Sequence, residues 1–298
     1  MEIRVLRYFL AVAREGSITA AANFLHLTQP TLSRQIKELE EELGKKLLIR
    51  KSHRVALTSE GMLFRKRAEE IIAMVDKTEA EFYAMKNTVR GDIYIGGGET
   101  EGIKLIANIA KDLRESYPGI HYHIYSGNSE YVTERLDKGL LDFGILIQPA
   151  DISKYDYINI PAKDTWGVIM RKDSPLAEKK WIEKEDLLNV PLLCSRQAIL
   201  EQRYKNEFIQ WFGEDFDRLD IVTTFNLMYN AAIMVEAGIG YAISIDKLVN
   251  TSKSSSLCFR PLRPKLEAGL NIVWKKYQVF STAAELFLER LQENFGKG

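Results

Sequence analysis

Apolar residues recur at helical spacing along the first part of the chain. Between residues 29 and 43, four of them lie four, three and four positions apart: Leu32, Ile36, Leu39 and Leu43. This spacing places them on one stripe of a helix. A similar stripe covers residues 2–14, and a short alanine-rich helix begins after Ser17, a residue type that caps helix N-termini. The pattern predicts three helices around one small core.

The third of these helices carries a polar face opposite its apolar stripe. Its start is predicted at Thr28 or Gln29, and Pro30 suits its first turn, where N–H groups have no partner inside the helix. The polar side chains are of the types that read base edges or hold DNA phosphates: Gln29, Thr31, Ser33, Arg34 and Lys37. A solvent-facing helix in any bundle would show the same pattern, so the neighbouring segments decide between the two interpretations.

Two short extended runs follow this helix. Gly44 ends it as a C-cap residue, and residues 45–50 and 54–57 then flank a basic turn. Basic side chains at such a turn can contact backbone phosphates or the minor groove; here they are Arg50, Lys51, His53 and Arg54. Helices followed by a basic hairpin predict a winged helix-turn-helix.

One long helix is predicted from residue 58 to about residue 86. Its apolar positions alternate four and three apart, which is a heptad seam: Phe64, Ala68, Ile71, Val75, Thr78, Phe82 and Met85. Such a seam indicates dimerisation through paired helices, although a helix packed on its own domain is the alternative. A dimer would bring two recognition helices to two half-sites on DNA.

Beyond a polar hinge at residues 87–91 the pattern changes to alternating strands and helices. Strands are predicted at 92–96, 120–126, 141–147, 166–170, 191–195, 221–225, 241–245, 257–262 and 270–275. Helices are predicted at 102–116, 129–138, 199–212, 226–237 and 281–295, with a polar crossover before residue 166. This alternation predicts a mostly parallel, helix-covered sheet in two lobes, with a ligand cleft beyond the carboxyl ends of the strands.

Charge is unevenly distributed along the 298 residues, although the formal net charge is +0. Residues 1–67 contain 13 Lys/Arg and 7 Asp/Glu and so carry +6, which leaves −6 on the remainder. A basic block attached to an acidic body is typical of a nucleic-acid-binding module. No apolar run approaches the roughly 18 residues of a membrane span, and the two cysteines lie in no metal-ligand spacing, so a cytoplasmic protein without a membrane segment or cofactor is predicted.

These segments resemble the LysR-type transcriptional regulators, and the resemblance runs through the whole chain. The carrying stretches are LRYFLAVAREGSITAAANFLHLTQPTLSRQIKELEEELGKKLLIR and HRVALTSEG, then YPGIHYHIYSGNSEYVTERLDKGLLDFGIL, DSPLA and VEAGIGYAI. The resemblance implies an α+β multidomain fold with a winged helix-turn-helix, a long dimerising linker helix and a two-lobed α/β domain like a type 2 periplasmic binding protein. It also implies promoter or operator DNA, a small-molecule effector, RNA polymerase and a second copy, in a homodimer or homotetramer, as partners.

The resemblance also implies domain limits and site residues. The expected domains are 1–58 for DNA binding, 59–87 for the linker and dimerisation helix, 88–91 for the hinge and 92–298 for effector binding. Lobe I is expected at about 92–161 and 266–298, and lobe II at about 162–265. The DNA-binding set is Ser17, Thr28, Gln29, Pro30, Thr31, Ser33, Arg34, Lys37, Arg50, His53 and Arg54. The effector-binding set is Gly98, Glu99, Thr100, Asn128, Ile147, Gln148, Ser195, Arg196, Phe225 and Asn226. The dimerisation set comes from the heptad seam itself and is Phe64, Ala68, Ile71, Val75 and Phe82.

The effector segment departs from the family pattern at three places. Gly98 stands where the family often has a serine whose hydroxyl holds an anion, Ile245 stands where proline is frequent, and Glu99 and Glu101 add negative charge. We therefore expect a neutral, cationic or zwitterionic effector whose positive end meets Glu99, in place of a simple carboxylate.

Rival functions find less support in the residues. The turn GGGETEG lacks the third glycine of a dinucleotide loop and the Gly-Lys-Ser/Thr of a P-loop. His121 and His123 share a strand face without a third metal ligand, and a hydrolase using Cys194 or Ser195 would lack a G-x-S-x-G turn. A two-lobed binding protein without a DNA role would leave the basic helix pair unexplained. A non-enzymatic regulator is predicted.

Overall fold

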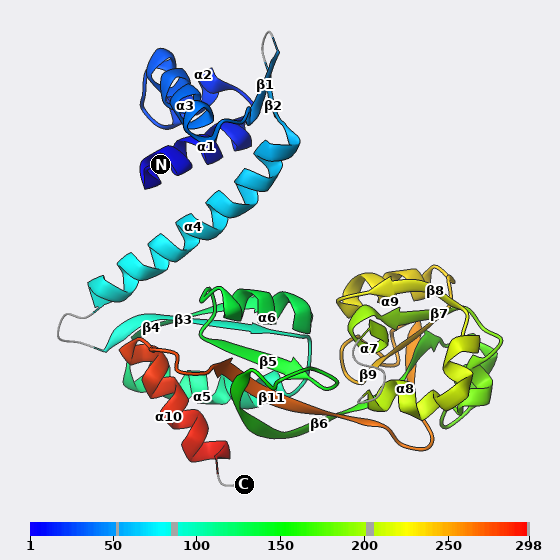
Figure 1. The fold of residues 1–298 in the computed structure, drawn as a ribbon. Helices are drawn as coiled ribbons and strands as arrows, with labels where there is room; N and C mark the ends of the chain where they lie inside the picture. The colour runs from blue at the N-terminus through cyan, green and yellow to red at the C-terminus, as the bar shows by residue number, and fades with distance from the viewer. Residues whose placement is uncertain (52–53, 85–88, 201–205, 297–298) are drawn as a thin grey trace. The chain divides into compact units, whose positions relative to one another are not determined.

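The computed structural model describes residues 1–51, 54–84, 89–200 and 206–296. His53 of the predicted DNA-binding set and Met85 of the predicted heptad seam lie outside these ranges. The chain divides into two compact units, Met1–Tyr83 and Ala84–Gly298. Each unit is described by itself below (Figure 1). Among the described residues, no helix combines the length and the apolar character needed to cross a membrane.

The first unit is a winged helix-turn-helix followed by one long helix. It consists of α1 (Ile3–Glu15), α2 (Ile18–Phe24), α3 (Gln29–Leu43), the antiparallel hairpin β1 (Leu48–Lys51) and β2 (Arg54–Leu57), and α4 (Ser59–Ala84). Leu32, Ile36 and Leu39 are buried in its core together with Phe9. The apolar stripe predicted on α3 is therefore the face that holds the three helices together.

The start of α4 packs against this core. The ring of Phe64 meets the ring of Phe9 edge-on, with 5.0 Å between centroids. Ala68 is fully buried, and Arg7 of α1 pairs with Asp76 of α4 at 2.6 Å. Phe64 thus packs within its own unit, as the alternative interpretation of the heptad seam requires at that position.

The second unit has two lobes, and one of its strands runs through both. Its strands are β3 (Arg90–Gly97), β4 (Gly119–Ser126), β5 (Phe143–Ile147), β6 (Tyr155–Arg171), β7 (Leu192–Ser195), β8 (Ile221–Phe225), β9 (Tyr241–Ile245), β10 (Leu257–Pro261) and β11 (Glu267–Lys275). Its α-helices are α5 (Ile103–Ser116), α6 (Ser129–Asp137), α7 (Arg196–Leu200), α8 (Glu207–Phe212), α9 (Met228–Glu236) and α10 (Thr282–Phe295). Short 3-10 helices lie at Pro175–Glu178, Lys184–Leu187 and Gly213–Arg218.

The strand order is β4-β3-β5-β11-β6-β9-β7-β8, with β10 also paired to β6. Strand β6 therefore runs through both lobes (Figure 1). Lobe I holds β3, β4, β5, β11 and the first part of β6, covered by α5, α6 and α10; lobe II holds the end of β6 with β7–β10 and α7–α9. Each lobe has its own apolar core, so each can keep its internal packing if the cleft between them changes.

Three sequence-based expectations about this unit are wrong in detail. The sheet is mixed, because β6, β10 and β11 join the parallel strands in antiparallel pairs. The predicted polar crossover before residue 166 is the first part of β6, which pairs with β11 along its length. The predicted helix 199–212 is interrupted at the buried, extended Asn206, which caps α8 by accepting hydrogen bonds from the N–H groups of Phe208 and Ile209; residues 201–205 of that prediction lie outside the described residues.

Candidate functional site

The N-terminus of α3 is fixed by its own side chains. Thr28 is the N-cap residue, and its Oγ1 accepts a hydrogen bond from the backbone N of Thr31 at 3.4 Å. Pro30 lies in the first turn, where no internal hydrogen bond is lost. Ser17 caps α2 in the same way by accepting from the N–H of Ala20, so the half-buried Ser17 has a structural role beside its predicted DNA contact.

The polar face predicted on α3 is the face that solvent reaches. Gln29, Thr31, Arg34 and Lys37 are exposed, and Ser33 is half-buried. Each cation forms a weak surface ion pair within the helix: Arg34 Nε lies 3.6 Å from Glu38 Oε1, and Lys37 Nζ lies 3.3 Å from Glu41 Oε1. Both cations can therefore exchange a carboxylate for a phosphate or a base edge at little cost. Arg54, which starts β2, is also exposed, and Arg50 lies in β1.

A buried carboxylate joins α3 to the hairpin. Glu40 is only 4 % exposed, and its Oε1 accepts hydrogen bonds from the backbone N of Leu47 at 2.8 Å and of Leu48 at 3.1 Å. Burial by itself would raise the pKa of Glu40, but these two bonds and the ammonium of Lys46 outweigh it and lower the pKa. Glu40 thus fixes where the wing leaves the recognition helix. Sequence reasoning missed this role; its only signal was an acidic residue beside the apolar stripe.

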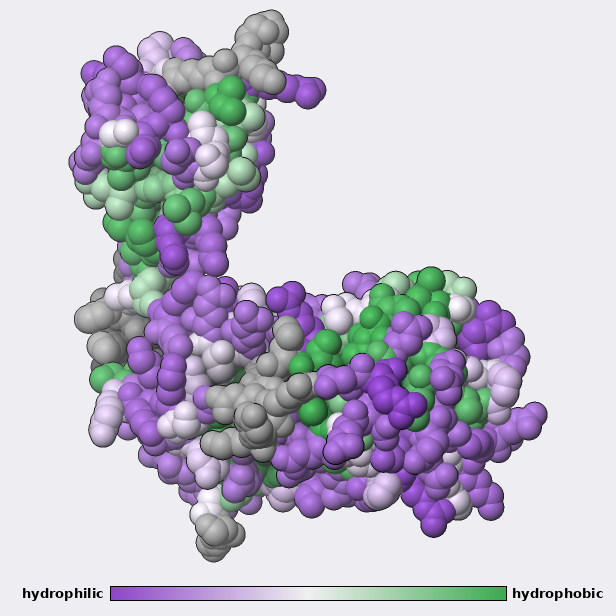
Figure 2. All heavy atoms as spheres, turned by 45° about the vertical axis from the view of Figure 1, so that its right-hand side comes forward, coloured by the Kyte–Doolittle hydropathy of each residue, from purple (hydrophilic) through white to green (hydrophobic). Residues whose placement is uncertain are grey.

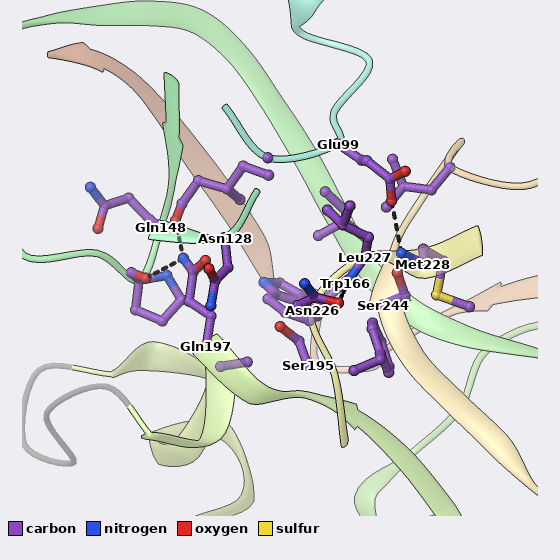
Figure 3. Close-up of a pocket in the computed structure, with 17 residues that line it drawn as sticks. Glu99, Asn128, Gln148, Trp166, Ser195, Gln197, Asn226, Leu227, Met228 and Ser244 are labelled. Carbon is purple, nitrogen blue, oxygen red and sulfur yellow. Dashed lines mark hydrogen bonds between the residues drawn. The ribbon is translucent and has the colours of Figure 1, made fainter. Parts of the chain in front are cut away.

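The second unit has a cavity between its lobes. It measures about 70 Å³ and lies at the carboxyl ends of β3, β5, β7 and β8 (Figure 3). Eight of the ten predicted effector residues line it: Gly98, Glu99, Asn128, Ile147, Gln148, Ser195, Phe225 and Asn226. The lining also includes residues that sequence reasoning did not select as effector contacts: Pro149, Trp166, Gln197, Ala198, Leu227, Met228, Ser244, Ile245 and Leu248.

Two predicted effector residues lie away from this cavity. Thr100 is buried, and its Oγ1 donates to Asp164 Oδ2 at 2.6 Å while accepting from the N–H of Gly102. Burial raises the pKa of Asp164, the Thr100 hydroxyl opposes this, and the nearby carboxylates of Asp246 and Glu101 add to the rise. Arg196 begins α7 with its side chain exposed. Thr100 therefore fastens the loop after β3 to β6, and Arg196 does not line the cavity.

Glu99 reaches across the cleft to lobe II. Its Oε2 accepts a hydrogen bond from the backbone N of Met228, the first residue of α9, at 2.7 Å (Figure 3). The N-cap residue of α9 is Leu227, which has no side-chain oxygen, and the side chain of Asn226 accepts from the N–H of Leu227 at 3.0 Å. Glu99 consequently supplies to α9 a hydrogen bond that the N-cap residue cannot give.

Gln197 forms a second link between the lobes. From α7 its Nε2 donates to the carbonyl oxygens of Ile147 and Pro149, both at 2.9 Å (Figure 3). Its Oε1 accepts from the N–H of Ser129 at 3.0 Å. Gln148, although it borders the cavity, donates its amide to Asn271 Oδ1 at 3.2 Å. Gln197, the neighbour of the predicted Arg196, is thus a second residue that bridges the cleft.

The lining is apolar with a few neutral polar groups. Within the part of the chain that the structure describes, Glu99 is its single charged side chain. Trp166 and Phe225 contribute aromatic surface, and Asn128, Ser195 and Ser244 offer hydrogen-bonding groups. The cavity therefore suits a small, partly apolar ligand and carries no cation to attract a carboxylate.

The described residues do not support the cysteine nucleophile or the histidine metal site considered from the sequence. Cys194 is fully buried, and burial raises the pKa of its thiol to about 12, so it is not a thiolate near neutral pH. His123 Nε2 lies 2.8 Å from Asp92 Oδ1. In the ranges that the structure describes, no group of three or more His, Cys, Asp or Glu side chains could hold a metal ion.

Comparison with protein families accounts for both units. Residues 3–62 match the model of bacterial regulatory helix-turn-helix proteins of the lysR family, and residues 86–296 match the LysR substrate binding domain. The chain belongs to the LysR family of transcriptional regulators. It is a DNA-binding regulator with an effector-binding domain, and the family is not enzymatic.

Characterised relatives and solved structures agree with this assignment. The transcriptional regulator AlsR of Bacillus subtilis is 30% identical over 99% of this chain and 91% of its own length. HcaR, the hca operon transcriptional activator of Escherichia coli, is 27% identical over 98% of both chains. The crystal structure of CbnR, a LysR family regulator, superposes with a TM-score of 0.76 at 21% identity over 99% of each chain. CbnR has also been solved in complex with its target DNA, with a TM-score of 0.74 over 98% of this chain.

Proposed function

We propose that this LysR-family regulator binds a small neutral, cationic or zwitterionic effector in the interlobe cavity, with Glu99 meeting its positive end. The observation that carries the proposal is the lining itself, which combines aromatic and apolar surface with one carboxylate as its single described charge. An ammonium group is attracted both by a carboxylate and by aromatic faces such as those of Trp166 and Phe225. Among the described lining residues, a dianion would meet no cationic side chain and would meet the negative charge of Glu99.

For DNA binding we propose the exposed face of α3 and the wing. Support comes from the solvent-facing side chains of Gln29, Thr31, Arg34 and Lys37 at the N-terminal part of a helix whose opposite side is buried. Arginine reads guanine with two hydrogen bonds, glutamine reads adenine, and hydroxyl groups hold phosphates. Arg50, His53 and Arg54 would contact the DNA backbone beside the groove.

Self-association belongs to the same proposal. Ile71 and Val75 of α4 keep part of their surface exposed and continue the seam toward Phe82, so a second α4 can pack there. Apolar surface also gathers on lobe II where α9 lies (Figure 2), with Tyr229 and Ile233 largely exposed. We propose a homodimer or homotetramer acting in the cytoplasm, with α4 as linker between the predicted domains 1–58 and 92–298.

The proposed mechanism connects the cleft to the DNA. Effector binding changes the relative orientation of the lobes, and the linker helices carry this change to the spacing of the paired DNA-binding domains. The bend of the DNA and its contact with RNA polymerase change as a result. Footprints with and without effector should differ in extent; identical footprints would contradict the mechanism.

A gel-shift assay with the DNA upstream of the neighbouring gene tests the regulatory function. We expect specific retardation that weakens steeply as salt rises, because basic side chains replace counterions on the phosphates. A scrambled duplex of the same length and composition is the control. A smear that is the same for both duplexes would contradict sequence-specific regulation.

Calorimetry tests the class of effector. Tight binding of a simple dianion, unchanged by Glu99→Gln, would overturn the proposal of a neutral, cationic or zwitterionic effector.

A further inference from the structure

Helix α9 begins without a cap of its own. Its nine residues start at Met228, and Leu227 at the N-cap position has no side-chain acceptor. The first N–H groups of a helix have no partner inside the helix, and their dipoles favour a negative group nearby. The Glu99 carboxylate, 129 residues away in the sequence, fills this position for the N–H of Met228 at 2.7 Å.

The position of Glu99 makes this contact more than a local cap. Glu99 follows β3 in lobe I, whereas Met228 follows β8 in lobe II, so the hydrogen bond joins the two lobes. Gly98, Glu99 and Leu248 line both the inner cavity and a second, outer hollow of about 340 Å³. Glu99 therefore borders both spaces.

We propose that Glu99 is a built-in anionic ligand for the N-terminus of α9, which joins the lobes and keeps carboxylate ligands out of this position. A carboxylate that entered here would have to replace Glu99 and meet its negative charge. A ligand with an ammonium or a neutral polar group does not compete for the same N–H. The inference rests on the proposed function only in taking the interlobe cavity as the effector site.

The test replaces the built-in carboxylate by a free one. In full-length Glu99→Ala, without DNA or effector, the amide of Met228 loses its acceptor, and its hydrogen exchange should become about tenfold faster. Acetate should then slow the exchange saturably, because it fits the vacated position. Acetamide, which has the same shape without the charge, should not, and sodium chloride at equal ionic strength corrects for salt. In the wild-type protein, acetate should leave hydrogen exchange at the Met228 amide unchanged.

Glu101→Ala is the matched control. Glu101 lies two residues away on the same loop and pairs with Lys104, so its loss removes a carboxylate without touching α9. The inference is overturned if hydrogen exchange at the Met228 amide is unchanged in Glu99→Ala, or if acetate and acetamide slow that exchange equally. It is also overturned if acetate slows the exchange in Glu101→Ala as much as in Glu99→Ala. Should Glu99→Ala unfold, Glu99→Gln keeps an acceptor and tests the charge alone: intermediate exchange supports the inference, and wild-type exchange overturns it. A failed gel shift would leave this result unaffected.

Discussion

The side-chain oxygen Oε1 of Glu40 lies 2.8 Å from the backbone N of Leu47 and accepts its hydrogen bond. Glu40 is near the end of the recognition helix α3, and Leu47 precedes the first strand of the wing. One buried carboxylate therefore couples the two elements that we propose to contact DNA. Gly61 supports the same junction from α4, because a Cβ there would lie 2.1 Å from the carbonyl oxygen of Leu47.

Glu40→Ala should destabilise the DNA-binding unit by about 3 kcal/mol, because the buried N–H groups of Leu47 and Leu48 lose their acceptor. Urea unfolding followed by circular dichroism measures the loss. Glu41→Ala, at the exposed neighbouring position, is the control and should change stability little. Equal effects of the two substitutions would show that the buried hydrogen bonds of Glu40 do not stabilise the unit.

The lowered pKa of Glu40 predicts an acid-dependent loss of stability. Because the folded-state pKa lies below the ordinary value of 4.5, the carboxylate stabilises the fold fully above that value. This contribution is lost as the pH falls through the lowered folded-state pKa. The free-energy difference between wild type and Glu40→Gln should therefore shrink between pH 5 and the acid-unfolding region. A difference that grows toward low pH would contradict the direction of the shift.

Arg34→Ala should weaken operator binding by about 1–3 kcal/mol while leaving the fold intact, because the side chain is 72% exposed and its pair with Glu38 lies on the surface. Gel shifts with operator and scrambled DNA measure the loss of specificity, and circular dichroism checks the fold. Lys111→Ala removes one positive charge from α5 and is the matched control. Unchanged operator affinity would mean that another face of α3 meets the DNA.

Gln197→Ala removes three hydrogen bonds between the lobes and should lower the stability of the second unit by about 2 kcal/mol. It should also change the effector concentration needed for a half-maximal footprint change. Arg196→Ala, one residue earlier and exposed, is expected to leave both quantities close to wild type. If Arg196→Ala has the larger effect on effector response, the residue predicted from the sequence is the contact after all.

Asp164→Asn should raise the unfolding temperature at neutral pH by a few degrees. Burial and neighbouring carboxylates raise the pKa of Asp164, so its ionised form opposes folding, whereas an amide oxygen can still accept from Thr100. The stability that Asp164 allows therefore depends on pH: it is highest where Asp164 is protonated in both states and falls as the pH rises through the raised folded-state pKa. Scanning calorimetry should show the gain of Asp164→Asn disappearing in acid. A constant gain would rule out this cause.

Local patterns were sufficient for the fold class, which the family match and the CbnR structure confirm. The bounds predicted for β8 and β9, residues 221–225 and 241–245, are those observed. Capping chemistry placed the start of α3, because Thr28 and Pro30 act through bonds within one helical turn. Such features depend on neighbours in sequence and can be read from a single chain.

The remaining features depend on distant partners. The segment Tyr155–Thr165 carries polar and charged residues and resembles a loop, but it becomes strand because β11 supplies a partner more than a hundred positions later. Gln197 and Glu99 acquire their contacts only when the lobes meet. No local periodicity encodes those pairings, so the role of the eight cavity residues in effector binding stays a prediction.

Strand β6, which runs through both lobes, has one irregular point in its pairing with β11. Its pairing with β11 jumps between Lys163 and Ile160, so Pro161 and Ala162 are passed over in the register. Proline has no N–H to give to the ladder, and such irregularities bend a strand. On either side the strand is clamped by full pairing, first with β11 and then with β9 and β10. We therefore expect any change in the relative orientation of the lobes to bend β6 at this irregularity before it disturbs the regularly paired stretches.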